Sequence, residues 1–460
     1  MTRSAAVLSL VLAMTTLFAS GDPFPNNPHR FLKSSLIRRL ESTTRSGSGR
    51  VYHAMDYGAD PTGKNDSTDA LMRAISDAFR PPDEGRFLIS GIVDLGGAQL
   101  DLDGGAYLLS RPLRLPSSGG GNFKIHSGSL RASDNFPKDG YLIELQPTAH
   151  QSGPQFASSY EYVTLQNLLI DANYVAGGIL IVDSLRTTVD TCYITRFASD
   201  GIAVVGGHET YIHNTFLGQH ITAGADPGER SFSGTAINIR GNDNAVTDVV
   251  IFSAAVGVMI SGQANVLTGV HCYNKATGFG GTGIYLKSPG LTQTRILNCY
   301  LDYTGIVAED PVQLLISGTF FLGNAFVKLK SVNGVMKGVT IVDNMFSGDD
   351  SASGIVQLDE SGGRFVTVER VVVERNDVSG MGDRSTVGRG SVTGNGTLWA
   401  VDLSGVLLFP DKVRNVQYAV QVGRGGGIVG HAVRNVSGNV VVVESDAPVE
   451  ATVHVLVDQS

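Results

Sequence analysis

The sequence contains few cysteines, few charged residues and no excess of positive charge, and each shortage excludes a class of protein. Its three cysteines are an odd and low number for 460 residues, which argues against a disulfide framework. The formal net charge is −8 at pH 7, so no large basic field is present and we expect no nucleic-acid partner. Beyond the amino terminus no stretch reaches about 18 apolar residues, so we expect no membrane span in the mature chain.

Glycine and β-branched residues are abundant instead. Glycine accounts for 57 of the 460 residues, well above its usual share of about 7%, yet the sequence has no collagen period and no long polar low-complexity tract. Valine and isoleucine are frequent, and charged residues make up only 17% of the chain. This composition is typical of a globular, β-rich protein with many tight turns.

The amino terminus has the pattern of a secretory signal peptide. Arg3 supplies a positive charge, an apolar stretch covers residues 5–19, and the small residues Ser20 and Gly21 follow; this stretch is short for a membrane span. We therefore predict a signal peptide over residues 1–21, a linker or processed segment over residues 22–50, and a secreted protein. Three Asn-x-Ser/Thr triplets are candidate glycosylation sites, at Asn65, Asn395 and Asn435.

An irregular repeat between about residues 160 and 380 is the strongest indication of the fold. Each unit combines alternating apolar positions, an aromatic residue, a glycine-containing turn and a second apolar run. The aromatic residues recur mostly every 20–27 residues, at Tyr193, Phe216, Phe252, Tyr273, Tyr300, Phe320 and Phe346. One coil cannot bury its apolar face alone, but stacked coils form a continuous core. We predict an all-β, right-handed parallel β-helix in which these aromatic residues stack internally.

The cysteines follow the same repeat. Cys192, Cys272 and Cys299 each stand directly before an aromatic residue, so we expect them at one position of the ladder. The spacing of neighbouring strands exceeds the separation of about 3.8 Å between Cβ atoms that a disulfide prefers. We therefore predict three buried thiols.

Both ends of the stack have a different pattern. Residues 65–69 offer several helix N-cap candidates, the apolar residues of 70–79 fall on one helical face, and Pro81-Pro82 follows. We predict a capping helix there. After about residue 385, apolar and polar residues alternate with period two, which favours antiparallel strands with one solvated face. We place the capped β-helix at residues 51–384 and a small antiparallel β domain at residues 385–460.

Two segments resemble a known family. The segment YGADPTGKNDSTDALMRAI, from Tyr57 to Ile75, is similar to the first motif of the pectate-lyase-3 branch of the pectin-lyase-like β-helices, and GAYLLSRPLRLP resembles that branch's next block. Over residues 50–460, including WAVDLSGVLLFP, the chain resembles the plant Quartet-type polygalacturonases. The resemblance implies secretion to a cell wall or pollen-associated matrix. It also implies hydrolysis of de-esterified galacturonan, the acidic polysaccharide of pectin.

The resemblance extends to candidate catalytic residues. Glycoside hydrolysis needs two carboxyl groups that flank the scissile bond. The segment ASDGIAV resembles the Asp-Asp motif of the related polygalacturonases of glycoside hydrolase family 28, with Asp200 on the second Asp; GQHI resembles the family's His motif, with His220 on the His. The resemblance implies Asp200 as the general acid and His220 as an orienting group. The Asn-Thr-Asp motif of that family has no clean match, which leaves Asp171 or Asp183 as the second carboxylate.

Binding of an acidic polysaccharide requires basic side chains near these carboxylates. The family's Arg-Ile-Lys motif falls on residues 259–261, which are Met-Ile-Ser here, so other cations must replace it. Arginine forms bidentate pairs with carboxylates, and the candidate substrate-binding residues are Arg230, Arg240, Lys275 and Lys287. No metal-ligand spacing and no phosphate-binding glycine loop occurs in the sequence, so we expect no cofactor. We expect a monomer.

Two other functions remain open from the sequence. A lyase or epimerase on a uronic-acid polymer would use Arg, Lys or Tyr as a base, often with Ca²⁺ on clustered acids. A catalytically silent protein that binds the polysaccharide would account for the incomplete motif set. Moreover, Asp200 before a glycine is a common turn pattern, and His220 begins a long insertion of a kind that is often surface decoration.

Overall fold

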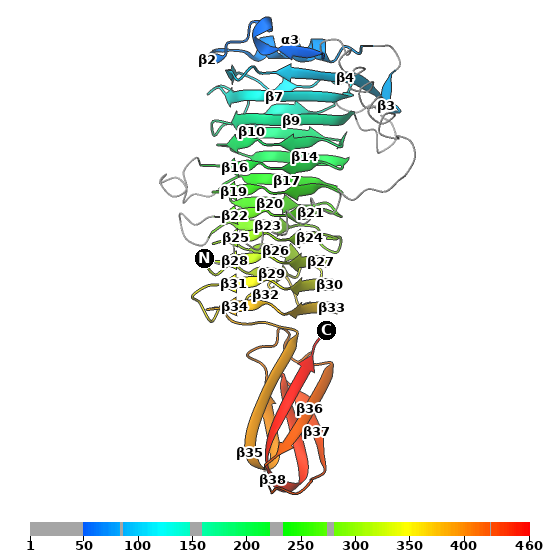
Figure 1. Cartoon of the computed structure of the whole chain (residues 1–460), viewed down its shortest axis with the longest axis vertical. Helices are drawn as coiled ribbons and strands as arrows, with labels where there is room; N and C mark the ends of the chain where they lie inside the picture. Colours follow the sequence, from blue (N-terminus) through cyan, green and yellow to red (C-terminus); the bar gives the residue numbers. More distant parts are fainter. Residues whose placement is uncertain (1–48, 83–85, 148–158, 221–232, 274–279, 424) are drawn as a thin grey trace, which may run out of the picture. The chain divides into compact units, whose positions relative to one another are not determined.

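The computed structural model describes residues 49–82, 86–147, 159–220, 233–273, 280–423 and 425–460. The predicted signal peptide and nearly all of the predicted linker lie outside the described residues, as do Arg230 and Lys275. Residues from Arg50 to Ser460 belong to one unit. Figure 1 shows their strands stacked as successive layers between α3 and β34, and a further group of strands from β35 to β38.

A short helix covers the first coil, as predicted. β1 (Val51–His53), the 3-10 turn η1 (Ala54–Tyr57) and β2 (Thr62–Asp66) precede α3 (Thr68–Ala78). The buried face of α3 consists of apolar residues mostly three or four positions apart, which are Ala70, Leu71, Ala74, Ile75 and Ala78. A helix with one such face covers the strand edges at the end of a solenoid. In the described part of the chain, no helix has the length and apolar character needed to cross a membrane.

Three ladders of parallel strands form the β-helix, named here after β14, β15 and β16. The β14 ladder contains β6 (Leu113–Arg114), β8 (Tyr141–Leu145), β10 (Gly177–Val182), β14 (Asp200–His208), β17 (Thr235–Asn242), β20 (Val256–Ile260), β23 (Thr282–Leu286), β26 (Ile306–Glu309), β29 (Val327–Lys330) and β32 (Val356–Asp359). The β15 ladder contains β12 (Thr188–Asp190), β15 (Tyr211–His213), β18 (Ala245–Thr247), β21 (Val266–Thr268), β24 (Arg295–Leu297), β27 (Val312–Ser317), β30 (Val335–Val342) and β33 (Thr367–Glu374).

The β16 ladder contains β13 (Tyr193–Thr195), β16 (Phe216–Gly218), β19 (Val250–Phe252), β22 (His271–Tyr273), β25 (Tyr300–Asp302), β28 (Phe320–Leu322), β31 (Met345–Ser347) and β34 (Asp377–Ser379). The long strands β7 (Gly120–Ala132) and β9 (Tyr160–Asp171) extend through both the β15 and β16 ladders. The first coils add β3 (Phe87–Ile89), β4 (Ile92–Asp101) and β5 (Ala106–Leu109), and β11 (Ser184–Leu185) pairs with β9 and β14.

Parallel register aligns equivalent residues from coil to coil. Ile202 of β14 pairs with Ile179 of the preceding coil and with Ile237 of the following coil, and the column continues through Val258 and Ile284. All five side chains are fully buried. Because neighbouring strands lie about 4.8 Å apart, each of these residues contacts its equivalents above and below. They belong to one continuous apolar core, and the predicted right-handed parallel β-helix is confirmed.

The predicted internal stack of aromatic residues is wrong. Tyr193 pairs with Phe216, but Phe252 pairs with Gly218, two positions further along the coil. Phe216 is 48% exposed, so this aromatic column faces outward, whereas Phe346 lies in a buried column. A shift of one residue in register moves a side chain to the opposite face of a strand. Regular spacing of aromatic residues therefore does not determine which face they occupy.

The three cysteines are free and buried, as predicted. Cys192 and Cys299 occupy equivalent positions, and the backbone N–H of each donates to a threonine hydroxyl on the next coil, at Thr215 and Thr319. Cys272 lies within β22, two positions further along the coil, so the expectation of a single ladder position was wrong. Burial raises the pKa of Cys192 to about 12 and the pKa of Cys299 to about 11.

The carboxyl-terminal strands form a small antiparallel sheet, which the alternating pattern predicted. It contains β35 (Val387–Asp402), β36 (Asn415–Val422), β37 (His431–Ser437) and β38 (Val440–Asp458). β38 pairs antiparallel with each of the other three strands. Residues of its buried face, which include Trp399, Val441, Val443 and Val453, form a core of their own.

Candidate active site

Four strand segments occupy the same place on successive coils of the β14 ladder. They begin at Tyr141, Gly177, Asp200 and Thr235. Tyr141 pairs with Gly177, and Asp200 pairs with Thr235. The pairing of β10 with β14, residue 179 opposite residue 202, aligns Gly177 with Asp200. Tyr141 therefore lies two coils before Asp200, with a glycine between them.

Tyr141 reaches across this glycine to the Asp200 carboxylate. The Tyr141 hydroxyl donates a hydrogen bond of 3.0 Å to Asp200 Oδ2. A Cβ atom at Gly177 would lie only 2.4 Å from two carbons of the Tyr141 ring, so the contact requires glycine at this position. Burial and the negative charge of Asp200 both raise the pKa of Tyr141 well above its ordinary value near 10. The phenol therefore remains protonated and acts as a donor to Asp200.

The following coil supplies a second donor to Asp200. Asn238 of β17 pairs with Ala203, and its side-chain amide nitrogen is 3.3 Å from both carboxylate oxygens of Asp200. The exposed Arg240 lies two residues further along β17. Its positive charge acts on the Tyr141 phenol and partly opposes the increase in pKa. Asp200 is thus a half-buried carboxylate held by neutral donors from both sides, with a guanidinium group nearby.

His220 lies at the turns that lead into the β14 ladder. It is the second residue after β16, is only 8% exposed, and its Nδ1 is 3.1 Å from the hydroxyl of Tyr174. The neighbouring Gln219 donates to the carbonyl of Phe197 at 3.2 Å, which fixes this segment to the turn that precedes Asp200. The turns that carry His220 and Asp200 are joined in this way, and no hydrogen bond between these two side chains occurs among the described residues.

Asp171 is engaged in a separate ion-pair cluster. It ends β9, is only 6% exposed, and pairs with Arg196 and, at 3.6 Å, with Nε of Arg131. Its Oδ1 also accepts a hydrogen bond of 3.0 Å from the backbone N–H of Asn173. Two guanidinium groups and a backbone donor thus occupy this carboxylate. The cluster locks the end of β9 and does not include Asp200.

The structure does not bring Asp183 to Asp200. Asp183 follows the last residue of β10, and its Oδ1 lies beside Gly206 near the far end of β14. Asp200 lies at the first residue of β14. Six residues at about 3.3 Å each separate the two ends, roughly 20 Å along the strands, whereas inverting glycosidases place their carboxyl groups about 6.5–9.5 Å apart.

The remaining predicted cations lie on the same ladder. Lys287 follows β23 and is exposed. The register from Ile239 through Ile260 to Leu286 places it in line with Arg240, two coils further along. Two coil spacings correspond to about 10 Å. Arg240 and Lys287 therefore form a row of positive charge, and their predicted role in substrate binding stays a prediction.

A further buried carboxylate lies on a later coil of this ladder. Glu309 is 6% exposed, accepts a hydrogen bond of 2.6 Å from the Tyr285 hydroxyl, and pairs with Lys330 Nζ at 3.0 Å. The hydrogen bond to Glu309 is the largest cause that raises the pKa of Lys330, while burial is the largest cause for Tyr285. β26, which ends at Glu309, is four coils beyond β14, so this network lies apart from Asp200.

The three predicted glycosylation sites are exposed in the structure. Asn65 lies in β2 and its amide nitrogen donates to Asp60 Oδ2 at 2.9 Å. Asn395 and Asn435 lie in β35 and β37. Accessibility is a requirement for attachment of a glycan, and all three positions meet it.

One group of potential metal ligands occurs among the described residues, on the first coils. Ligand atoms of His53, Asp101 and Asp103 lie within 4.8 Å of one another. His53 Nδ1 is already 2.6 Å from Asp103 Oδ1. An ion pair between these two side chains accounts for their proximity without a metal. The group lies on β1 and at the end of β4, several coils from Asp200.

Sequence analysis missed the two partners of Asp200. Both have a signal in the sequence once the coils are aligned by their shared pattern. The segments YLIEL, GGILIV, DGIAVV and TAINIR each place an isoleucine at the third residue, from Tyr141, Gly177, Asp200 and Thr235. That alignment places Tyr141, Gly177 and Asp200 in one column and Asn238 one coil further. A small residue between two polar residues in such a column indicates that the two polar side chains make contact across the small residue.

Together the ladders and this site define a parallel β-helix protein with a hydrogen-bonded carboxylate on one strand ladder. Comparison with known sequences then assigns the family. The chain is 58% identical over 471 aligned residues to the protein named polygalacturonase QRT3 of Arabidopsis thaliana, and the alignment covers 99% of this chain and 97% of that protein. The chain therefore belongs to the family of plant QRT-type polygalacturonases.

Solved structures with a similar chain trace have low sequence identity. ORF18 of Geobacillus virus E2 is 12% identical with a TM-score of 0.47, over 93% of this chain and 82% of that chain. The A-module of the mannuronan C-5 epimerase AlgE6 of Azotobacter vinelandii is 13% identical with a TM-score of 0.42, over 72% of this chain and 98% of that chain. No family model matches the sequence.

Proposed function

We propose that the protein is a secreted polygalacturonase that hydrolyses α-1,4-galacturonan in a cell wall or pollen matrix. The observation that carries this proposal is the Asp200 carboxylate, to which Tyr141, two coils before, and Asn238, on the following coil, both donate. The proposal draws its substrate from the relative that is 58% identical and named a polygalacturonase. Arg240 and Lys287, aligned on the same ladder, suit the carboxylate groups of a polyuronide.

In this proposal Asp200 supplies the catalytic carboxyl group that protonates the glycosidic oxygen. The hydroxyl of Tyr141 donates to Asp200 while the carboxylate is ionised and accepts from it when the carboxyl is protonated, because a hydroxyl has both capacities. Tyr141 thus keeps the group oriented through both steps of a proton transfer. His220, packed between the turns, positions the backbone that precedes Asp200.

The second carboxyl group of the reaction must come from another coil. Asp183 is too distant by register, and the carboxylate of Asp171 is occupied by Arg131 and Arg196. Asp171 becomes available only if substrate attracts one of these guanidinium groups to its own carboxylates. The guanidinium group stays paired in this exchange, because a substrate carboxylate replaces Asp171 as its partner. We therefore favour Asp171 over Asp183.

The raised pKa of Tyr141 argues against this tyrosine as the base of an elimination reaction. A lyase or epimerase needs a base that removes the proton next to the uronate carboxylate. Tyr141 is a candidate for this base because its hydroxyl is hydrogen-bonded to Asp200. Burial and the charge of Asp200 both disfavour its phenolate. A protonated phenol cannot serve as that base.

Product analysis on de-esterified polygalacturonan tests the proposal. The wild-type protein should release new reducing ends without the ultraviolet absorbance of unsaturated ends, and Asp200→Asn should abolish the release. Asp183→Asn, which removes a carboxylate from the far end of the same ladder, should retain activity. Unsaturated products would assign a lyase. Binding without any product from a folded wild-type sample would assign a silent polysaccharide-binding protein.

A further inference from the structure

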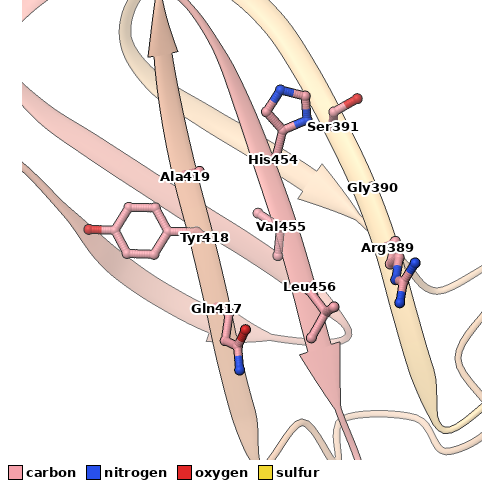
Figure 2. A pocket seen from close by; sticks show the side chains of 9 residues that line it. All are labelled: Arg389, Gly390, Ser391, Gln417, Tyr418, Ala419, His454, Val455 and Leu456. Atoms are coloured by element: carbon pink, nitrogen blue, oxygen red, sulfur yellow. The ribbon is translucent and has the colours of Figure 1, made fainter.

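The open face of the carboxyl-terminal sheet carries a polar hollow that the catalytic proposal does not use. A pocket of about 580 Å³ lies over β35, β38 and β36. Figure 2 shows its lining side chains on these three strands. They are Arg389, Gly390, Ser391, Gln417, Tyr418, Ala419, His454, Val455 and Leu456.

Strand register arranges the polar side chains in two rows on one face. Leu456 of β38 pairs with Arg389 of β35 on one side and with Gln417 of β36 on the other. His454 of β38 pairs with Ser391 of β35. Residues two positions apart on a strand point to the same face, so both rows face the same side of the sheet. In Figure 2, Tyr418 points away from them, as expected for the row between.

The opposite face of these strands is the core of the domain. Val453 and Val455 of β38 are 0% and 3% exposed, respectively, whereas His454 between them is exposed. The polar rows therefore stand on a packed sheet and not on a loop. Leu456 supplies an apolar floor between Arg389 and Gln417.

The polar side chains in these rows have no partner within the protein. Among the described residues, Arg389, Ser391, Gln417 and His454 form no side-chain hydrogen bond or ion pair. No carboxylate lines the pocket, although the whole chain has a net charge of −8. By contrast, Arg434 of the same domain pairs with Glu444 at 3.1 Å. The hollow is thus a local cationic site with unused donors in an acidic protein.

We propose that this face binds an anionic polysaccharide through the carboxylate of a uronate unit. Arg389 forms the bidentate pair with the carboxylate, Gln417 and His454 bind ring hydroxyls, and Leu456 contacts the apolar face of the sugar. The distance across the three strands is about 10 Å, enough for one to two sugar rings. The choice of a polyuronide rests on the proposed function, and the site itself is separate from Asp200.

Affinity measurement on the full chain with Asp200→Asn, which prevents cleavage, tests the site. The probes are de-esterified polygalacturonan and its fully methyl-esterified form, in affinity gels and by titration calorimetry. Adding Arg389→Ala or His454→Ala should weaken binding of the de-esterified polymer about tenfold or lower its stoichiometry, and Arg389→Lys should restore part of it. Arg434→Ala removes the same charge from the same domain and should leave binding unchanged.

The outcomes separate this proposal from the catalytic one. If wild-type protein cleaves galacturonan while Arg389→Ala and His454→Ala bind as tightly as the parent, the surface site is refuted and the hydrolase is not. If no cleavage occurs but Arg389→Ala still weakens binding, the site stands and the hydrolase fails. Equal loss with Arg434→Ala, or equal binding of the esterified polymer to the same face, would also overturn recognition of a uronate carboxylate. Unchanged melting temperatures establish that each variant is folded.

Discussion

The hydroxyl of Tyr141 donates a 3.0 Å hydrogen bond to the carboxylate of Asp200, although the two residues are 59 positions apart in the chain. The contact spans two coil spacings because Gly177, on the coil between them, leaves space for the tyrosine ring. The orientation of this half-buried carboxylate depends on the neutral donors on either side of it. Substitution of each neighbour separately therefore tests how much the orientation of Asp200 contributes to activity.

Substitution Tyr141→Phe should reduce catalysis more than stability. It removes the donor to Asp200 and leaves the ring in place, and hydrogen bonds to charged groups contribute about 1.5–3 kcal/mol. We expect kcat/KM on galacturonan to fall roughly 10- to 100-fold, with little change in melting temperature. Tyr211→Phe, at a tyrosine that is 46% exposed on the β15 ladder, is the matched control. Equal activity of the two variants would show that Tyr141 has no part in the reaction.

Substitution Gly177→Ala should damage the site through the same contact. The new methyl group would lie 2.4 Å from the Tyr141 ring and 3.0 Å from the Asp200 backbone oxygen, so the ring must move away from Asp200. Overpacking of this kind costs about 1–3 kcal/mol. We expect a lower melting temperature and a loss of activity at least as large as that of Tyr141→Phe. In a Tyr141→Ala background, the additional loss of stability should be much smaller; an undiminished loss would assign the effect to the backbone contact alone.

The fold could be predicted largely from the sequence, because solenoid patterns are local. The capping helix needs only its own apolar spacing, and the alternation after residue 385 needs only its own strands. The register of the coils is a different problem. Between Phe216 and Phe252 the interval is longer than elsewhere, and the pairing shifts by two residues there. An insertion of this kind hides which residues are stacked. The wrong face has a separate cause, because a two-residue shift keeps a side chain on the same face of its strand and the spacing of aromatic residues does not show which face points inward.

The candidate site was predictable only in part for the same reason. Asp200 and His220 became candidates because single motifs point to them. Tyr141 and Asn238 come from coils whose motifs were not compared, and their roles depend on tertiary contacts. The occupied state of Asp171 was equally hidden, because Arg131 and Arg196 approach it from neighbouring coils. Residue types at one turn cannot show which charges neutralise them.

The thiols should be unreactive in the native protein. Burial raises the pKa of Cys192 to about 12 and that of Cys299 to about 11, and Cys272 is buried as well. The thiolate is the reactive form, so a thiol reagent at pH 8 should label almost none of them. After denaturation without reductant it should label all three. Fewer than three labels, or an intact mass two daltons low, would indicate a disulfide.

The ion pair of His53 and Asp103 should make the first coils more stable at acidic pH. The hydrogen bond that His53 donates to the Asp103 carboxylate, followed by the negative charge of Asp103, raises the pKa of His53 above 6.5. The folded state therefore binds the proton more tightly than the unfolded state. The stabilisation is fully present below about pH 6.5 and is lost as the pH rises through the folded-state pKa. The melting-temperature difference between wild type and His53→Asn should be larger at pH 5 than at pH 8.

A double-mutant cycle isolates this pair. In an Asp103→Asn background the His53→Asn substitution should no longer produce a pH-dependent difference. Because His53 is exposed, salt should also reduce the effect. A pH dependence that persists without Asp103 would assign it to Asp101 or to His126, whose Nδ1 is 3.8 Å from Asp101.

The charge row on the β14 ladder should act on substrate binding and not on the chemical step. Arg240 lies beside the Asp200 site and Lys287 lies two coils further along, so each would contact a different uronate unit of a bound polymer. Loss of one charge-assisted contact should raise KM roughly tenfold. The kcat should change less, since the contact is equal in the ground and transition states.

The length of the substrate separates the two residues. For Arg240→Ala the increase in KM should appear with short and long oligogalacturonides, whereas for Lys287→Ala it should appear only with substrates long enough to span about 10 Å beyond Arg240. Length-dependent kinetics of both variants, with Arg375→Ala as a control at a surface ion pair with Asp343, distinguishes this arrangement from a general effect of net charge. If all three variants raised KM equally, the row would contribute only to the overall field of the protein.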